Sequence, residues 1–203
     1  MKRLFCILSL ALLLASGISS TAAMAQTAGA PAAPANPGAT TAGDYKAQAL
    51  LTLTIICRRL VIMAQRIPAE KYTWDPGLNG RTVSQLLLHT AMLNFIRPGQ
   101  FGAAPPTGFN PENYEKSSTD KAHIVDQMTQ AFAYSEAAVQ KLSDADMQRH
   151  IKVNGVDTTV AAFLQAWISD TSEYVGQAIV YTRLNGAMPP TPQSVVTPQP
   201  SVR

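Results

Sequence analysis

Apolar side chains recur at alternating spacings of three and four positions in four segments of this 203-residue chain, which is the period of an amphipathic α-helix. The four stripes cover residues 50–67, 82–96, 125–142 and 163–181. Prolines end the first two stripes, and an Asn-Gly pair followed by two prolines ends the fourth. No alternating strand pattern of comparable length accompanies them in the sequence. The pattern therefore predicts an all-α fold, an antiparallel four-helix bundle, with a long Pro- and Gly-rich connection over residues 97–117.

The N-terminus has the order of a secretory signal peptide. A positively charged start (MKR) precedes an apolar stretch at residues 4–15, which is too short to span a bilayer comfortably. The Ala-Met-Ala sequence before Gln26 fits the small-x-small rule for cleavage. We therefore expect residues 1–25 to be removed and the protein to be exported to the periplasm or the extracellular space. An uncleaved membrane anchor is the alternative interpretation.

Composition separates the folded body from its two ends. Residues 26–43 are rich in Ala, Pro and Gly and offer no apolar face, which is typical of a linker. Residues 191–203 are rich in proline and have no helical period, so they are expected to form a disordered or surface-draped tail. The predicted four-helix bundle thus occupies residues 44–190, the length of one ordinary domain.

The net charge of the chain bears on whether the protein binds nucleic acid or membranes. Lys and Arg total 16 and Asp and Glu total 13, so the formal net charge is +3, and removal of the first 25 residues would leave +1. Such a scattered, nearly balanced charge argues against a nucleic-acid-binding protein. The only long apolar run lies in the predicted signal peptide, so no membrane contact is expected after cleavage.

Cysteine usage adds one restriction. Cleavage would remove Cys6 and leave Cys57 as the only thiol, so the exported protein cannot form an internal disulfide. Cys57 lies on the first apolar stripe, where a small buried hydrophobic residue is the simpler interpretation than a reactive thiol.

Polar residues interrupt the apolar stripes of the second and fourth predicted helices. His89 lies between leucines of the second stripe. Core positions of the fourth stripe are occupied by Asp170, Tyr174 and Gln177, and Glu173 lies one residue off this seam. A buried polar group destabilises a bundle unless it is paired, so we expect these side chains to be one another's partners. One interpretation is a hydrogen-bonded network that joins His89 to Asp170 and uses the neighbouring Tyr and Gln to satisfy the rest; the other is a metal site.

Two stretches of the chain resemble sequence motifs of the DinB-like family. Residues 74–76 (WDP) and 81–89 (RTVSQLLLH) are similar to the entry of the family's second helix, which delivers its first metal-binding histidine. Residues 170–190 (DTSEYVGQAIVYTRLNGAMPP) resemble its last helix, where the pattern H-x-x-x-H-x-G-Q is followed by Y-x-R-x-x-G and two prolines. The resemblance covers residues 44–190. It implies an up-down-down-up four-helix bundle, often dimeric, that holds a divalent metal such as zinc or nickel with three histidines.

The ligand set that this resemblance implies is altered in the present chain. His89 matches the first ligand, but Asp170 and Tyr174 stand where the other two histidines belong. Aspartate can supply an oxygen donor, whereas a tyrosine hydroxyl, with a reference pKa of about 10, is a poor ligand at neutral pH. The set would bind a divalent ion weakly, and iron or manganese would suit it better than zinc or nickel. The family glycine at Gly176 is expected to allow close packing of a neighbouring helix.

The sequence thus predicts an exported DinB-like protein of unknown specific activity. Its degenerate metal site is expected to act as a buried polar network or as a binding site for an unidentified small molecule, with Glu173 and Gln177 in support. The alternative is a metal-dependent enzyme, of the hydrolase or thiol-dependent transferase type, that uses His89 and Asp170. Replacement of two histidines favours the first interpretation, and retention of a histidine and a carboxylate on one seam keeps the second. The resemblance also makes a homodimer an expectation, and no catalytic residue is assigned.

Overall fold

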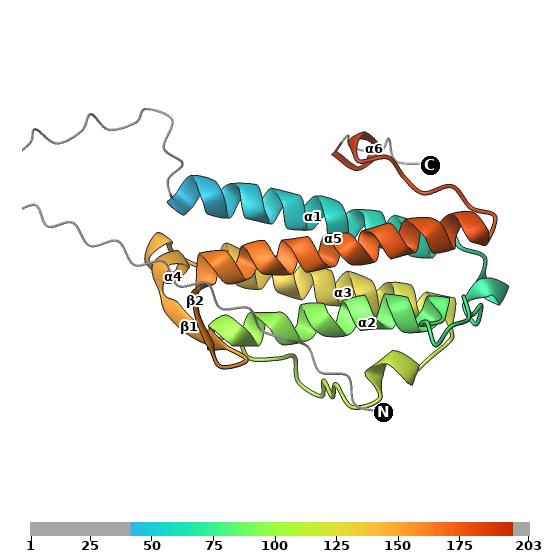
Figure 1. Cartoon of the computed structure of the whole chain (residues 1–203), viewed down its shortest axis with the longest axis horizontal. Helices are drawn as coiled ribbons and strands as arrows, with labels where there is room; N and C mark the ends of the chain where they lie inside the picture. Colours follow the sequence, from blue (N-terminus) through green and yellow to red (C-terminus); the bar gives the residue numbers. More distant parts are fainter. Residues whose placement is uncertain (1–41, 197–203) are drawn as a thin grey trace, which may run out of the picture. The chain divides into compact units, whose positions relative to one another are not determined.

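The computed structural model describes residues 42–196. The predicted signal peptide, all but the last two residues of the predicted linker and the end of the predicted tail (197–203) lie outside the described residues. Within the described part, four long helices run side by side (Figure 1): α1 (Ala42–Arg66), α2 (Val83–Ile96), α3 (Lys121–Gln140) and α5 (Val160–Leu184).

The four helices coincide with the four predicted stripes, so the prediction of an all-α four-helix bundle is confirmed. Helix α1 packs against α5 and α3, and α2 packs mainly against α3. The connections carry the remaining elements, which are short: η1 (Ala69–Lys71), η2 (Arg97–Phe101), η3 (Tyr114–Lys116), α4 (Asp144–Gln148), β1 (His150–Val153), β2 (Val156–Thr159) and α6 (Gln193–Val196).

A small hairpin between α4 and α5 is an addition to the predicted fold. Strands β1 and β2 pair antiparallel, and Asn154 and Gly155 turn the chain between them, with φ of 50° and 82°. Both angles lie in the left-handed region, as a tight two-residue hairpin turn requires. Thr159 ends the hairpin and caps α5, because its hydroxyl accepts a hydrogen bond from Ala162 N at 3.2 Å. The hairpin thereby fixes where α5 begins.

One apolar core fills the space between the four helices. Its largest fully buried side chains come from all of them and include Leu60 of α1, Leu86 of α2, Met128 of α3 and Trp167 of α5. By length and mean hydropathy (1.6), Asp44–Arg66 would suffice to cross a membrane. A core helix has the same properties, and α1 buries a full stripe of apolar residues against α3 and α5.

The start of the C-terminal segment packs on the bundle, as the surface-draped alternative for the tail requires, and adds a short helix. Helix α6 lies against α1, and Val195 is only 6% exposed. An apolar side chain within an otherwise Pro-rich segment gives that segment something to bury, and composition averaged over the whole tail hides it. The packed part of the chain therefore extends past Pro190, at least to Val195.

Candidate functional site

The start of α2 is fixed by a capping box. The Thr82 hydroxyl accepts a hydrogen bond from Gln85 N at 3.3 Å, and the Gln85 side-chain oxygen accepts one from Thr82 N at 3.0 Å. These two bonds satisfy backbone donors that a helix leaves unpaired at its first turn. His89 follows on the next turn, so the cap determines where its imidazole enters the bundle.

The residues that carry the family resemblance hold this end of the bundle together. Trp74 O accepts a hydrogen bond from Val83 N at 3.1 Å, which ties the loop after α1 to the start of α2. The rings of Trp74 and Tyr181 meet edge to face, with centroids 5.1 Å apart. The Tyr181 hydroxyl also donates to Arg81 O at 3.0 Å, so α5 is joined to the same loop. The motif positions therefore place α1, α2 and α5 relative to one another.

His89 is the centre of a polar cluster formed by α2, α5 and η3. Its Nδ1 lies 2.6 Å from Glu115 Oε1, and its Nε2 lies 2.9 Å from the Tyr174 hydroxyl. The imidazole and phenol rings are 5.0 Å apart and close to perpendicular. The His89 side chain is 10% exposed. Both ring nitrogens are thus paired inside the bundle.

Arg81 completes this cluster from the residue before the cap. Its Nε donates to Glu115 Oε2 at 2.8 Å and its Nη2 donates to Glu115 Oε1 at 3.4 Å. Burial alone would raise the pKa of Glu115, but hydrogen bonds from Arg81 and His89 outweigh burial and hold this pKa below its usual value. Glu115 is therefore a carboxylate at neutral pH, shared between a guanidinium and an imidazole.

The protonation state of His89 follows from the same surroundings. Burial lowers the pKa of the imidazole, the hydrogen bond to Glu115 opposes that effect, and the charges of Arg81 and Arg97 lower the pKa further. The net shift is downward, so His89 is neutral at pH 7. In the tautomer that satisfies both contacts, Nδ1–H donates to Glu115 and Nε2 accepts from the Tyr174 hydroxyl.

Asp170 has a different partner, because Arg97 at the end of α2 forms an ion pair with it. Arg97 Nη1 also donates to the Thr171 hydroxyl at 3.1 Å, and the guanidinium lies 5.9 Å from the centre of the Trp167 ring. Burial lowers the pKa of Arg97 to about 10, which still leaves it charged at pH 7. This ion pair and the His89–Tyr174 bond are two polar links between α2 and α5.

The structure brings together only part of the predicted site. His89 and Tyr174 meet, whereas Asp170 is paired with Arg97 rather than with His89. The supporting residues Glu173 and Gln177 are both exposed on α5. The expectation for Gly176 is wrong: it is exposed, and a Cβ placed there would have nothing within 4 Å.

Sequence reasoning missed two members of the cluster, Glu115 and Arg81, and the partner of Asp170, Arg97. Arg81 lay within the quoted motif, and Arg97 directly precedes the proline that ends the second stripe, so both were near recognised signals. Glu115 comes from the Pro- and Gly-rich connection, where no period indicates which side chain faces the bundle.

The donor set does not fit the divalent metal that the family resemblance implies. Among residues 42–196, no three His, Cys, Asp or Glu side chains lie close enough to hold an ion. Each carboxylate of the site is already neutralised by an arginine, Glu115 by Arg81 and Asp170 by Arg97. Both guanidinium charges also act on His89, so a further dication at the imidazole would be repelled.

A cleft opens beside the cluster at the other polar link. It has a volume of about 350 Å³, within the range of small-molecule sites. The ion pair of Arg97 and Asp170 lines the cleft, and so do Phe163 and Trp167, whose ring centroids lie 6.3 Å apart. The other lining residues are Ile96, Gln100, Val153, Asn154 and Ala166.

The fold and the cluster define a four-helix bundle protein with a polar seam between its second and last long helices. A model of the DinB superfamily matches residues 53–173, and the chain belongs to this superfamily. Two similar solved structures are DinB-like proteins from Bacillus cereus and Bacillus subtilis, each 17% identical to this chain. The first covers 70% of this chain and 94% of its own with a TM-score of 0.63, and the second covers 71% and 96% with a TM-score of 0.58. Among curated proteins, no sequence matches this chain significantly.

The lowered pKa of His89 predicts a pH dependence of stability. Below pH 6.5 the unfolded chain binds a proton on His89 that the folded chain does not, so stability is lost as pH falls through 6.5. A second loss follows below pH 4.5, where unfolded Glu115 takes up a proton first. Urea unfolding at pH 7.5 and 5.5 measures the first loss, which should be smaller in His89→Gln. The control His123→Gln, at an exposed position on α3, should keep the native difference; equal behaviour of both variants would contradict the prediction.

Proposed function

We propose that this protein is an exported DinB-like ligand-binding protein in which a polar cluster has replaced the metal. The observation that carries the proposal is the pairing of His89, since Glu115 and Tyr174 already occupy both nitrogens that could ligate an ion. A ligand-binding role needs no open coordination position, whereas metal catalysis does.

In this proposal the polar residues stabilise the cleft by fixing α2 and α5 relative to each other. The His89–Tyr174 bond and the Arg97–Asp170 ion pair cross-link α2 and α5, and the second of these lines the cleft. Asp170 is the more accessible partner, because its side chain is 37% exposed and that of Arg97 is 14% exposed. A small molecule with a donor group suits this carboxylate, and the amides of Gln100 and Asn154 offer further hydrogen bonds.

Metal analysis of the purified protein tests the proposal against a metal enzyme. We expect well below one zinc, nickel, iron or manganese ion per chain, and a melting temperature that a chelator leaves unchanged. The variant His89→Gln should then have the same metal content as the native protein. Stoichiometric metal that is lost in His89→Gln or Asp170→Asn would overturn the proposal and support a metal-dependent enzyme that uses these two residues.

Export is tested separately by N-terminal analysis of protein recovered from outside the cytoplasm. We expect the chain to begin at Gln26, because the charged start, the apolar stretch and the Ala-Met-Ala sequence follow the order that signal peptidase recognises. A chain that retains Met1 in an intact, membrane-attached form would contradict this part of the proposal.

A further inference from the structure

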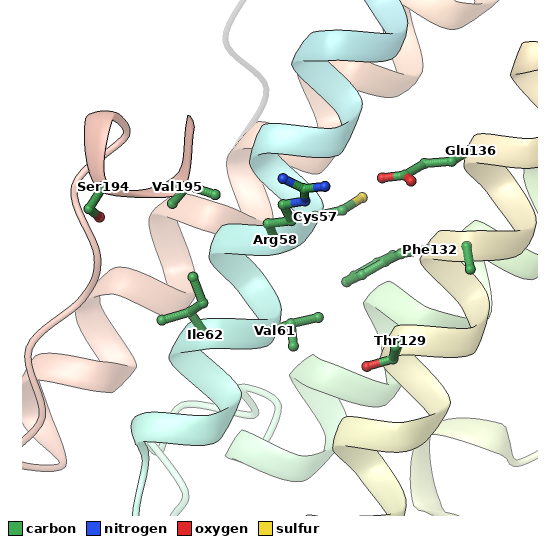
Figure 2. A pocket seen from close by; sticks show the side chains of 10 residues that line it. Cys57, Arg58, Val61, Ile62, Thr129, Phe132, Glu136, Ser194 and Val195 are labelled. Atoms are coloured by element: carbon green, nitrogen blue, oxygen red, sulfur yellow. The ribbon is translucent and has the colours of Figure 1, made fainter. Parts of the chain in front are cut away.

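A second cavity lies away from the polar cluster, between α1, α3 and the C-terminal helix α6 (Figure 2). Its volume is about 380 Å³, which suits a small molecule. Most of its wall is apolar: α1 contributes Val61 and Ile62, α3 contributes Phe132 and Ala133, and α6 contributes Val195. Cys57, Arg58, Thr129, Glu136 and Ser194 complete the lining.

Two opposite charges stand at this cavity without neutralising each other. Arg58 comes from α1 and Glu136 from α3, and Figure 2 shows them on either side of the Cys57 side chain. Within residues 42–196, neither side chain takes part in an ion pair or hydrogen bond. Burial and, after it, the charge of Glu136 raise the pKa of the Cys57 thiol. The cavity thus combines an apolar wall with two charged side chains, Arg58 and Glu136, that have no ion-pair partner within residues 42–196.

We propose that this pocket binds a small zwitterion with an apolar body, such as an α-amino acid with a large aliphatic or aromatic side chain. Its carboxylate pairs with Arg58, its ammonium group pairs with Glu136, and its side chain lies against the apolar wall. Charge complementarity selects this class. A simple carboxylate would bring a second anion towards Glu136, and a simple amine would bring a second cation towards Arg58.

The size of the site, about 380 Å³, favours a small molecule over a second copy of the chain. Three elements line the cavity, and α6 contributes Val195, which is 6% exposed. A stable protein interface needs a surface several times larger than a small ligand covers. The pocket shares no lining residue with the cleft at Arg97, so its occupant does not depend on the function proposed above.

Calorimetric titration of the purified protein tests the inference with matched probes. We expect L-leucine and L-phenylalanine to bind, 4-methylpentanoate and 3-methylbutylamine to bind about tenfold more weakly or not at all, and glycine to show no binding. Arg58→Gln and Glu136→Gln should each weaken leucine binding about tenfold. Asp126→Asn, an exposed change on the same helix as Glu136, should leave binding unchanged.

Melting curves of the three variants establish that each is folded, since all three changes are at side chains with solvent access. The inference is overturned if neither amino acid binds, if 4-methylpentanoate binds as tightly as leucine, or if folded Arg58→Gln and Glu136→Gln bind like the native protein. Concentration-dependent dimerisation that Arg58→Gln abolishes would also overturn it, because a second copy would then be the occupant.

Discussion

Replacing Leu60 with alanine is expected to lower the free energy of unfolding by about 2–5 kcal/mol. Leu60 lies in α1 with 0% of its surface exposed, so the shorter side chain leaves a cavity that its neighbours cannot fill without moving. A single domain is stable by only about 5–15 kcal/mol, so this loss is a large part of the total. Urea unfolding measures it as a lower midpoint with an unchanged slope.

The matched control for this prediction is Leu51→Ala on the same helix. Leu51 is 52% exposed, and we expect its replacement to change stability by less than about 0.5–1 kcal/mol. Equal losses in the two variants would show that the buried face of α1 has been assigned incorrectly.

The second large effect is expected at the polar cluster, in a double-mutant cycle of His89→Leu and Tyr174→Phe. Each single change removes the hydrogen bond between the two residues and leaves the remaining one without this partner, which should cost roughly 1–3 kcal/mol. The double variant removes both partners, so it should cost less than the two single changes together. The coupling should survive in the presence of a chelator, because a direct hydrogen bond of 2.9 Å joins the two residues.

A second double-mutant cycle, on His89 and Asp170, is the control for the first. Asp170 is bound by Arg97, so His89→Leu and Asp170→Asn should be closer to additive. Strict additivity for His89 and Tyr174 would mean that the imidazole and the phenol do not meet. A coupling that chelator abolishes would instead indicate a metal between them.

The four long helices could be predicted because each buries one continuous face. Each helix has a stripe of apolar residues with the helical period, and one member of each stripe illustrates its burial. These members, all buried in the common core, are Leu60, Leu86, Met128 and Trp167. The hairpin was missed because each strand has only four residues, of which Ile151 alone is buried. Helix α6 was missed for a similar reason, since it has only four residues, Gln193–Val196.

The site could be predicted only where both partners lie on regular helices. The period places His89 and Tyr174 on the seam between α2 and α5, and these two residues do bond to each other. The same period says nothing of Arg97, which lies at the end of α2 and takes Asp170 as its partner. It also cannot reveal Glu115, because the connection that carries this residue folds without a repeating pattern.

The burial of Cys57 has a consequence for how motion of the bundle can be followed. The thiol is 1% exposed, and its raised pKa keeps it protonated, whereas alkylating reagents attack the thiolate. A chain that begins at Gln26 contains no other cysteine, so any alkylation of the native protein would report an opening between α1 and its neighbours. The ratio of the alkylation rates in the unfolded and native states then gives the free energy of that opening, about 1.4 kcal/mol for each factor of ten. A chain that begins at Gln26 thereby carries a single built-in label for how often its core opens.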